Sequence, residues 1–326
     1  MNKFYARFRL FYLNNSIIFI FIALSVMSGI LSDKFFSVRN WLNILNNFSV
    51  TGIVSCGVAL VLIAGGIDLS FGSILACCSV FAAFLEPRSL FLAILLPVLL
   101  GVLLGLFNGF IVAKIGANPL ITTLGTQWLY FALLMIVTSG NLVQGNSDTP
   151  FHFIGHGKIF NIPFPIYFFL GIVLFAWFLS RKTLYGKYLF AHGSNKNALF
   201  CSGIDSSHIY MMTFAIMGLL VGIGGVVLSS RLIGVRPTEG GRYLMNVLTA
   251  VILGGVSLNG GIGSLVNVMI AVVVLGVIDN SMVLLGVPYK DQQIIRGGIF
   301  ILSIIYNNYL VNQSEIFRRK SVSQES

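Results

Sequence analysis

The chain has 326 residues, of which 56% are hydrophobic and only 9% are charged, and its mean hydropathy is +0.92. Because soluble domains carry about 25% charged residues, this composition excludes an ordinary soluble protein. The formal net charge of +10 does not indicate nucleic-acid binding, since the basic residues cluster at the ends of apolar runs and suit anionic lipid headgroups. Apolar runs of about 20 residues recur along the chain. We therefore expect one all-α, polytopic membrane domain over residues 1–326, with about ten transmembrane helices.

The N-terminal half predicts five spans and one shorter helix. The spans are expected at residues 10–31, 49–63, 71–85, 90–113 and 119–138. Residues 36–48 place Trp41 and other apolar side chains opposite asparagines, which predicts a short helix lying in the membrane interface, too short to span. Gly101, Gly105 and Gly109 recur at four-residue spacing, which is typical of close helix packing.

The C-terminal half predicts five more spans, at residues 166–180, 209–228, 247–253, 262–285 and 293–310. The polar triplet 279–281 is expected to interrupt the ninth. Residues 139–165 form the longest polar stretch and contain His152 and His156. Because no third ligand lies near, we expect a solvated loop and no metal. The four cysteines lie in or beside apolar runs and are expected to be packing residues.

The most unusual stretch is residues 63–73, where Gly65 and Gly66 break an apolar run and Asp68 follows. Each glycine costs about 1 kcal/mol of helix propensity relative to alanine, and a buried charge costs several more unless it is paired or faces water. Irregular backbone survives at membrane depth only where protein covers it or a water-filled cavity adjoins it. A broken helix beside a polar path is predicted; the alternative is a plain loop with Asp68 as an N-cap at the headgroups.

A second glycine break repeats this pattern, since residues 254–259 match residues 65–70, and residues 275–279 loosely match 104–108. Paired glycine-broken segments are typical of transport pathways; chance similarity in a chain with 35 glycines is the alternative. The span count does not decide between an inverted and a parallel repeat. Neutral hydroxyls and amides near the breaks suit a sugar better than an ion. The predicted path residues are Gly65, Gly66, Asp68, Ser70, Asn108, Thr126, Gln127, Ser257, Asn259 and Asn280, with Thr122 and Thr123 beside them.

The sequence contains no motif for catalysis. It lacks a P-loop, G-x-S-x-G, H-E-x-x-H and C-x-x-C, so we expect neither enzymatic activity nor a cofactor. Asp68 and Asp279 are isolated acids within spans, too few for a proton relay. This counts against an ion- or proton-coupled secondary carrier that works alone, the alternative from a different class.

Three stretches together resemble a known family. They are residues 65–73 (GGIDLSFGS), 186–204 and 237–261. In these, and in the same order over nearly the whole chain, the sequence is similar to permease subunits of bacterial ATP-binding-cassette sugar importers of the ribose, xylose and galactose type. One departure is Leu244, which replaces a family glutamate, with Arg242 nearby. This departure indicates altered substrate or partner contacts, or a heterodimer whose other subunit retains the glutamate.

The resemblance implies a homo- or heterodimeric channel in the cell inner membrane, a cytoplasmic ATPase and a periplasmic sugar-binding protein. It implies that residues 181–205 are a cytoplasmic coupling loop, whose ATPase contacts are Gly186, Ala191, Gly193, Asn195, Ala198, Gly203 and Ile204. An ordinary basic loop at the headgroups is the alternative. Basic clusters at 3–9, 181–196 and 318–320 place both termini in the cytoplasm. A same-fold permease for a branched-chain amino acid or a nucleoside is the second hypothesis.

Overall fold

The computed structural model describes residues 3–146 and 148–322, and these are almost entirely helical. The helices are α1 (Lys3–Leu31), α2 (Val38–Ile63), α3 (Phe71–Leu85), α4 (Leu90–Phe110) with a π-helical turn η1 (Ile111–Ile115), α5 (Pro119–Thr138), the 3₁₀ turn η2 (Pro150–His152), α6 (Phe153–His156), α7 (Phe164–Lys182), α8 (Leu184–Ser194), α9 (Lys196–Cys201), α10 (Ser206–Leu232), α11 (Glu239–Leu253), α12 (Leu265–Leu284) and α13 (Tyr289–Val322). Two short antiparallel pairs join β1 (Val143–Gln144) to β4 (Gly234–Val235), and β2 (Lys158–Ile159) to β3 (Ile162–Pro163).

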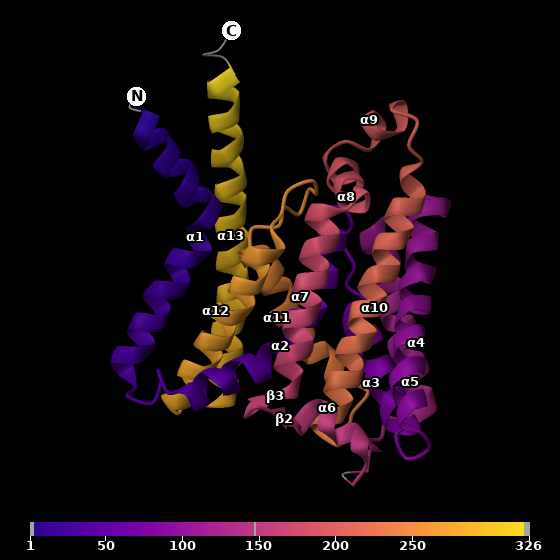
Figure 1. Cartoon of the computed structure of the whole chain (residues 1–326). Helices are drawn as coiled ribbons and strands as arrows, with labels where there is room; N and C mark the ends of the chain where they lie inside the picture. The colour runs from indigo at the N-terminus through magenta and orange to yellow at the C-terminus, as the bar shows by residue number, and fades with distance from the viewer. Residues whose placement is uncertain (1–2, 147, 323–326) are drawn as a thin grey trace.

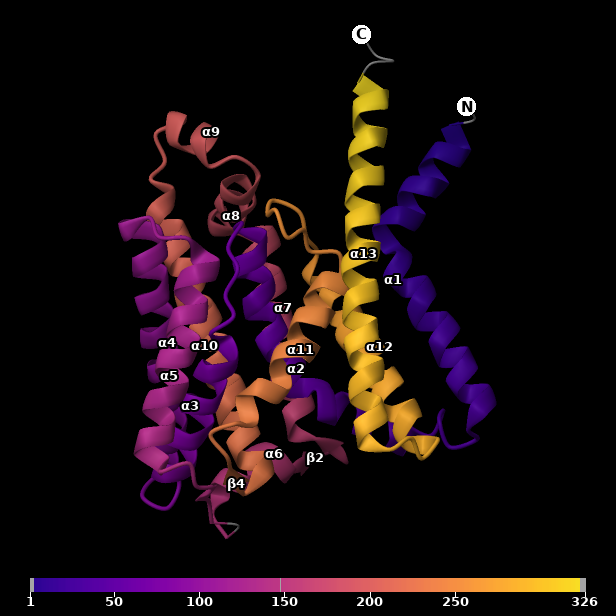
Figure 2. The ribbon, with the colours of Figure 1, turned by 180° about the vertical axis from the view of Figure 1, so that it is seen from behind.

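Six of the described helices are long and apolar enough to cross a membrane: α2, α4 with η1, α5, α7, α10 and α12. This confirms the predicted all-α, polytopic membrane fold, while the number ten stays a prediction. Figures 1 and 2 show the long helices running side by side between two ends. We call them the α8 end, which also holds the start of α1 and the last turns of α13, and the α6 end, which holds the two strand pairs.

The predicted packing role of the glycines in α4 is confirmed. A Cβ added at Gly101 would overlap the carbonyl oxygen of Gly218, and one at Gly105 would overlap that of Phe214. Gly218 and Gly222 are themselves four residues apart on α10, and they face α4 in turn. Glycine on both helices lets the two backbones touch, which is how membrane helices gain close van der Waals contact.

The prediction of a separate interfacial helix at residues 36–48 was wrong, because α2 continues from Val38 to Ile63. Ser37 caps its start by accepting a hydrogen bond from the Asn40 amide. In Figures 1 and 2 the first turns of α2 run across the α6 end before the helix rises through the bundle. Arg231 donates to the carbonyl oxygens of Asn46 and Asn47 at 2.9 and 3.4 Å. Carbonyls that bond outside the helix ladder permit a bend without a break.

The predicted interruption of the ninth span at residues 279–281 was also wrong. Helix α12 runs unbroken through these residues because each polar side chain has a partner. Asp279 pairs with Arg296, and the amides of Asn280 and Asn40 exchange two hydrogen bonds of 2.8 and 2.9 Å. The Ser281 hydroxyl donates to the carbonyl of Val277 at 2.7 Å.

The prediction of a solvated loop over residues 139–165 is corrected in its centre, where Phe151 and His152 are buried. His152 Nδ1 donates to the carbonyl oxygen of Ser230 at 2.8 Å, and its Nε2 lies 3.3 Å from a carboxylate oxygen of Glu86. Glu86 also accepts a 2.5 Å hydrogen bond from the Thr149 hydroxyl. This polar cluster holds the segment onto α10 and the end of α3.

Candidate translocation and coupling site

The two glycine breaks lie next to each other at the α8 end. The Gly261 amide donates a 2.8 Å hydrogen bond to the carbonyl oxygen of Ile63, the last residue of α2. A Cβ at Gly260 would press on the backbone of Gly65. Gly65 and Gly260 have φ values of 82° and 83°, which side chains rarely permit. Each break therefore depends on glycine both for its turn and for contact with the other break.

Helix α8 packs on both breaks at once, through Gly193. A Cβ added at Gly193 would overlap the carbonyl oxygen of Ile63 and the amide nitrogen of Gly261, the two atoms that hydrogen-bond across the breaks. The predicted coupling loop therefore contacts the predicted path segments directly. Next to Gly193, His192 stacks on Tyr210 of α10 with ring centroids 4.7 Å apart. Burial, and to a smaller extent Lys196, lowers the pKa of His192 to about 4, so this stacked imidazole is neutral at pH 7.

The other predicted coupling residues lie on or beside α8 and α9 at the same end. Gly186 is buried against the backbone of Ser180. Ala191 and Ile204 are half-buried, whereas Asn195, Ala198 and Gly203 are exposed. Asn195 caps α9 by accepting from the Ala198 amide at 3.0 Å. The exposed Phe200 in the same helix was not singled out from sequence, because the loop also contains Tyr185, Tyr188 and Phe190 and no pattern distinguishes Phe200 from them.

Asp68 lies in a buried hydrogen-bonded cluster between the first break and α4. One carboxylate oxygen accepts from both the amide and the hydroxyl of Ser70 at 2.6 Å. The Asn108 amide nitrogen donates to the Ser70 hydroxyl at 2.7 Å and to the other Asp68 oxygen at 3.5 Å. Tyr130 of α5 donates to the Asn108 amide oxygen at 3.0 Å. Asp68, Ser70 and Asn108 are thus brought together, and protein rather than water surrounds them in this conformation.

Helix α5 holds the extended segment after the break. The Thr123 hydroxyl donates to the carbonyl of Ile67 and accepts from the amide of Leu69, both at 3.2 Å. Thr126 is buried one turn later, and the backbone carbonyl of Gln127 accepts from Ser73 at 2.9 Å. Buried backbone that lacks a helix ladder must find such partners.

The second break has fewer side-chain contacts. The Ser257 hydroxyl accepts from the amide of Asn259 at 3.2 Å. Ser257 is buried, whereas Asn259 is exposed.

The two remaining predicted path residues lie outside the second break. Gly66 of the first break faces Tyr210, and a Cβ added at Gly66 would overlap the Tyr210 hydroxyl. Asn280 is the one predicted path residue that lies elsewhere, towards the α6 end of α12, opposite Asn40.

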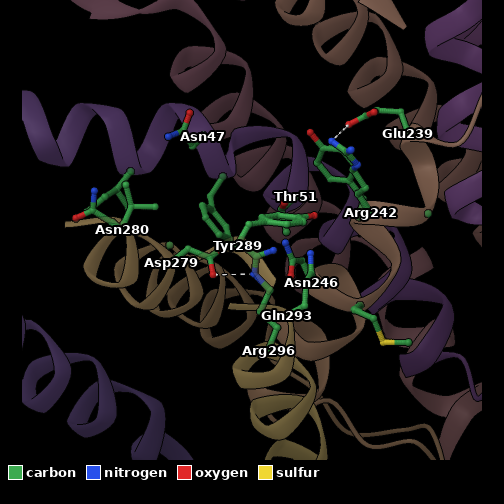
Figure 3. Close-up of a pocket in the computed structure, with 17 residues that line it drawn as sticks. Asn47, Thr51, Glu239, Arg242, Asn246, Asp279, Asn280, Tyr289, Gln293 and Arg296 are labelled. Atoms are coloured by element: carbon green, nitrogen blue, oxygen red, sulfur yellow. Dashed lines mark hydrogen bonds and ion pairs between the residues drawn. The ribbon is translucent and has the colours of Figure 1, made fainter. Parts of the chain in front are cut away.

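Asn280 lines a polar cavity of about 430 Å³ between α2, α11, α12 and α13. We call it the polar cavity; Figure 3 shows Thr51, Asn246, Tyr289 and Gln293 grouped beside the pair of Asp279 and Arg296, with Asn47 and Asn280 at the edge of the group. Its polar lining residues are Asn47, Thr51, Glu239, Arg242, Tyr243, Asn246, Asp279, Asn280, Tyr289, Gln293 and Arg296. They come from the starts of α11 and α13, the end of α12 and the bent part of α2, so the cavity lies at the α6 end.

The charges in the polar cavity cancel in pairs. Arg296 donates to both carboxylate oxygens of Asp279 through Nε and Nη2, each at 3.0 Å. At the rim, Arg242 Nη1 lies 3.4 Å from a carboxylate oxygen of Glu239. The bidentate pair is the stronger of the two because both groups are partly buried and aligned. The Asn280 amide is engaged by Asn40, so the groups that remain to meet a solute are other uncharged ones, among them Asn246, Gln293 and Tyr289.

Comparison with known proteins agrees with this architecture. The family model described as "Branched-chain amino acid transport system / permease component" matches residues 40–304. The ribose import permease protein of Bacillus subtilis is 35% identical, over 86% of this chain and 88% of its own length. The ribose import permease protein of Escherichia coli K12 is 34% identical, over 90% of this chain and 92% of its own. The L-arabinose transport system permease protein of the same strain is 34% identical, over 89% of each chain. No solved structure matches.

The chain belongs to the family of permease subunits of ATP-binding-cassette sugar importers. The resemblance seen in the sequence is confirmed, and the permease is a multi-pass membrane transport protein and not an enzyme.

Sequence reasoning missed most of the polar cavity of this permease. It treated Asp279 as an isolated acid, whereas Arg296 neutralises it from the next helix. The signal was available in the short turn between α12 and α13, which makes the two helices antiparallel neighbours and brings residues 17 apart into contact. Asn246, Tyr289 and Gln293 gave no such signal, because each is one ordinary polar residue at the end of an apolar run.

Proposed function

We propose that the permease carries a monosaccharide of the pentose class across the cell inner membrane, driven by a separate ATPase subunit. The observation that carries this proposal is the close contact of Gly193 with the backbone of Ile63 and Gly261. A movement of α8 acts there on both glycine-broken segments at once. Rigid-body movement of one packed element against another is a common route to alternating access. The pentose class follows from the relatives, whose names specify ribose and L-arabinose.

The ATPase docks on the α8 end in this proposal. The exposed side chains of α9 form its contact surface, and Phe200, with 74% of its surface exposed, is its apolar anchor. Exposed aromatic residues that fill a partner's pocket carry much of the energy of protein interfaces. Asn195 fixes the angle between α8 and α9 by capping the second helix, so the pair moves as one body.

The α8 end faces the cytoplasm in this proposal, with both termini on that side. The last turn of α7 carries Arg181 and Lys182, α8 carries Lys187 and α9 begins with Lys196, and positive residues favour the cytoplasmic side. The starts of α1 and the last turns of α13 lie at the same end (Figure 1). The α6 end then faces the periplasm, where a sugar-binding protein delivers the solute.

A second permease subunit, identical or different, completes the passage in this proposal. Leu244, which replaces the family glutamate, does not line the polar cavity. It lines a smaller pocket with Gly72, Gln127, Trp128 and Thr238, between α3, α5 and α11. Most of the path residues predicted near the breaks are buried in this conformation, whereas Gly65 and Asn259 are exposed; in this proposal the buried ones open when α8 moves.

Reconstitution tests the proposal. The permease is purified with the ATPase and binding protein that copurify with it, and uptake of labelled D-ribose, L-arabinose and leucine into proteoliposomes is measured with and without ATP. ATP-dependent uptake of a pentose is expected. ATP-dependent uptake of leucine alone would instead support an amino-acid permease, the alternative that agrees with the description of the matching family model.

A matched pair of variants tests the docking surface. Phe200→Ala should reduce capture of the ATPase about tenfold or more, because truncating an interface anchor costs about 2 kcal/mol. Phe160→Ala removes an aromatic ring that is 91% exposed at the α6 end, and it should leave capture of the ATPase unchanged. Equal capture by both variants would remove α9 as the docking surface.

A further inference from the structure

We propose that the polar cavity at the α6 end is a binding site for an uncharged monosaccharide, which the solute occupies before it reaches the glycine breaks. This inference rests on the proposed direction of transport and adds a site to it. The cavity volume of about 430 Å³ falls within the range of about 300–1,000 Å³ typical of small-molecule sites. The lining also has the composition of such a site, with convergent polar groups among aromatic and aliphatic side chains.

The charge balance of the cavity selects the class of solute. Asp279 and Arg296 satisfy each other through two aligned hydrogen bonds of 3.0 Å. An ion, or an amino-acid zwitterion, would have to break this partly buried pair, at a cost of several kcal/mol. An uncharged polyol keeps the pair intact. Its hydroxyls donate to the remaining carboxylate lone pairs and accept from the remaining guanidinium N–H groups.

Two amides in the cavity are free to bind hydroxyl groups. The side chains of Asn246 and Gln293 make no hydrogen bond with the residues that the structure describes. Each amide offers two donors and one carbonyl acceptor, which match the paired donor and acceptor character of neighbouring sugar hydroxyls. Figure 3 shows Asn246 and Gln293 beside Tyr289 and Arg296. The Tyr289 ring, more than half exposed, supplies an apolar surface for the C–H face of a sugar ring.

The bent part of α2 completes the site and connects it to the first break. Asn47 and Thr51 line the cavity from α2, and Arg231 donates to the Asn47 amide oxygen at 3.0 Å. Twelve residues beyond Thr51 the same helix ends at Ile63, the residue that contacts Gly193. Occupancy of the cavity and the position of α8 therefore act on the middle and on the last residue of the same helix.

Protection of a cysteine placed in the cavity tests this site. The full-length permease carries Cys201→Ser, which removes the exposed native thiol, together with Met245→Cys, at an exposed lining residue to which no hydrogen bond with the solute is assigned. Its reaction with a water-soluble maleimide in nanodiscs is timed at increasing D-ribose or L-arabinose. Lys158→Cys, exposed on β2 at the same end, is the matched control outside the cavity.

The expected result is that a pentose slows labelling of the cavity cysteine and leaves the control unchanged. Labelling slows by the factor 1 + [L]/Kd. At tenfold above a Kd of about 1 mM, the slowing is therefore about elevenfold. Slowing by leucine but by neither pentose would overturn the sugar class, and no slowing by any solute at these concentrations would overturn the site.

A second pair of variants checks that protection comes from binding. In the cysteine background, Gln293→Ala should raise the pentose concentration for half-protection about three- to tenfold, since one or two hydrogen bonds are lost. Lys290→Ala, on the same helix but outside the cavity lining, should not change it. Equal effects would contradict the assigned role of Gln293. ATP-driven pentose uptake without protection of the cysteine would contradict this site and support the proposed function. Protection without uptake would support the site and contradict the proposed function.

Discussion

Replacing Gly193 by alanine tests the contact between α8 and the glycine breaks. The added Cβ overlaps the Ile63 carbonyl and the Gly261 amide, so α8 must move away or the 2.8 Å hydrogen bond between those groups must break. Overpacking costs about 1–3 kcal/mol, and the hydrogen bond contributes about 1 kcal/mol more. Alanine regains about 1 kcal/mol of helix propensity. The clash therefore dominates, with a net cost of about 1–3 kcal/mol.

Two measurements read out this change: the thermal unfolding midpoint of the permease in nanodiscs, and the number of sugar molecules imported per ATP hydrolysed. Both should fall in Gly193→Ala. Gly125→Ala is the control, because a Cβ at Gly125 of α5 meets open space and gains only the helix propensity. If Gly193→Ala matched Gly125→Ala in both measurements, α8 would not bear on the breaks as described.

Three further predictions concern other contacts of the fold. Gly105→Leu should lower the unfolding midpoint sharply, because α4 must separate from α10; the lipid-facing Gly125→Leu should have little effect, and equal losses would contradict the glycine contact. Glu86→Ala should destabilise the permease by about 1–3 kcal/mol in denaturant unfolding, since the buried His152 ring loses the carboxylate beside its Nε2. Glu86→Gln should recover part of that loss. Hydrogen bonds from Ser207, with help from Lys114 and His208, lower the pKa of Asp205 to about 2. The ionised carboxylate therefore stabilises the fold above the ordinary pKa of about 4, and this contribution is lost as pH falls through about 2. In Asp205→Asn, the thermal unfolding midpoint should change less with pH between these two values than it does in the unmodified permease.

The sequence predicted the fold class and the positions of both glycine breaks because these depend on local composition. Long apolar runs require membrane helices, and adjacent glycines end them. The contact between Gly65 and Gly260 was not predictable, because no local pattern relates two segments almost two hundred residues apart. Their shared contact with Gly193 depends in the same way on how α8 folds back over the bundle.

The errors came from polar residues whose partners lie on other helices. When read one segment at a time, the asparagines after residue 39 indicated a separate interfacial helix, and the triplet 279–281 indicated an interrupted span. In the folded chain Asn40 and Asn280 bind each other, which removes the reason for either helix to break. Asp279 and Arg296 form the same kind of pair. Cross-helix pairing is a tertiary property, so the polar cavity that these residues line also escaped prediction, apart from Asn280.

The most direct test of the account is whether the break of α11 opens during transport. Ser257 is buried and Asn259 is exposed in this structure, so a Ser257→Cys variant in the assembled importer should resist a water-soluble thiol reagent at rest, while Asn259→Cys reacts. On addition of ATP and binding protein, the account predicts that Cys at position 257 becomes reactive. If it stays unreactive in every nucleotide state while uptake proceeds, the glycine breaks do not border the passage.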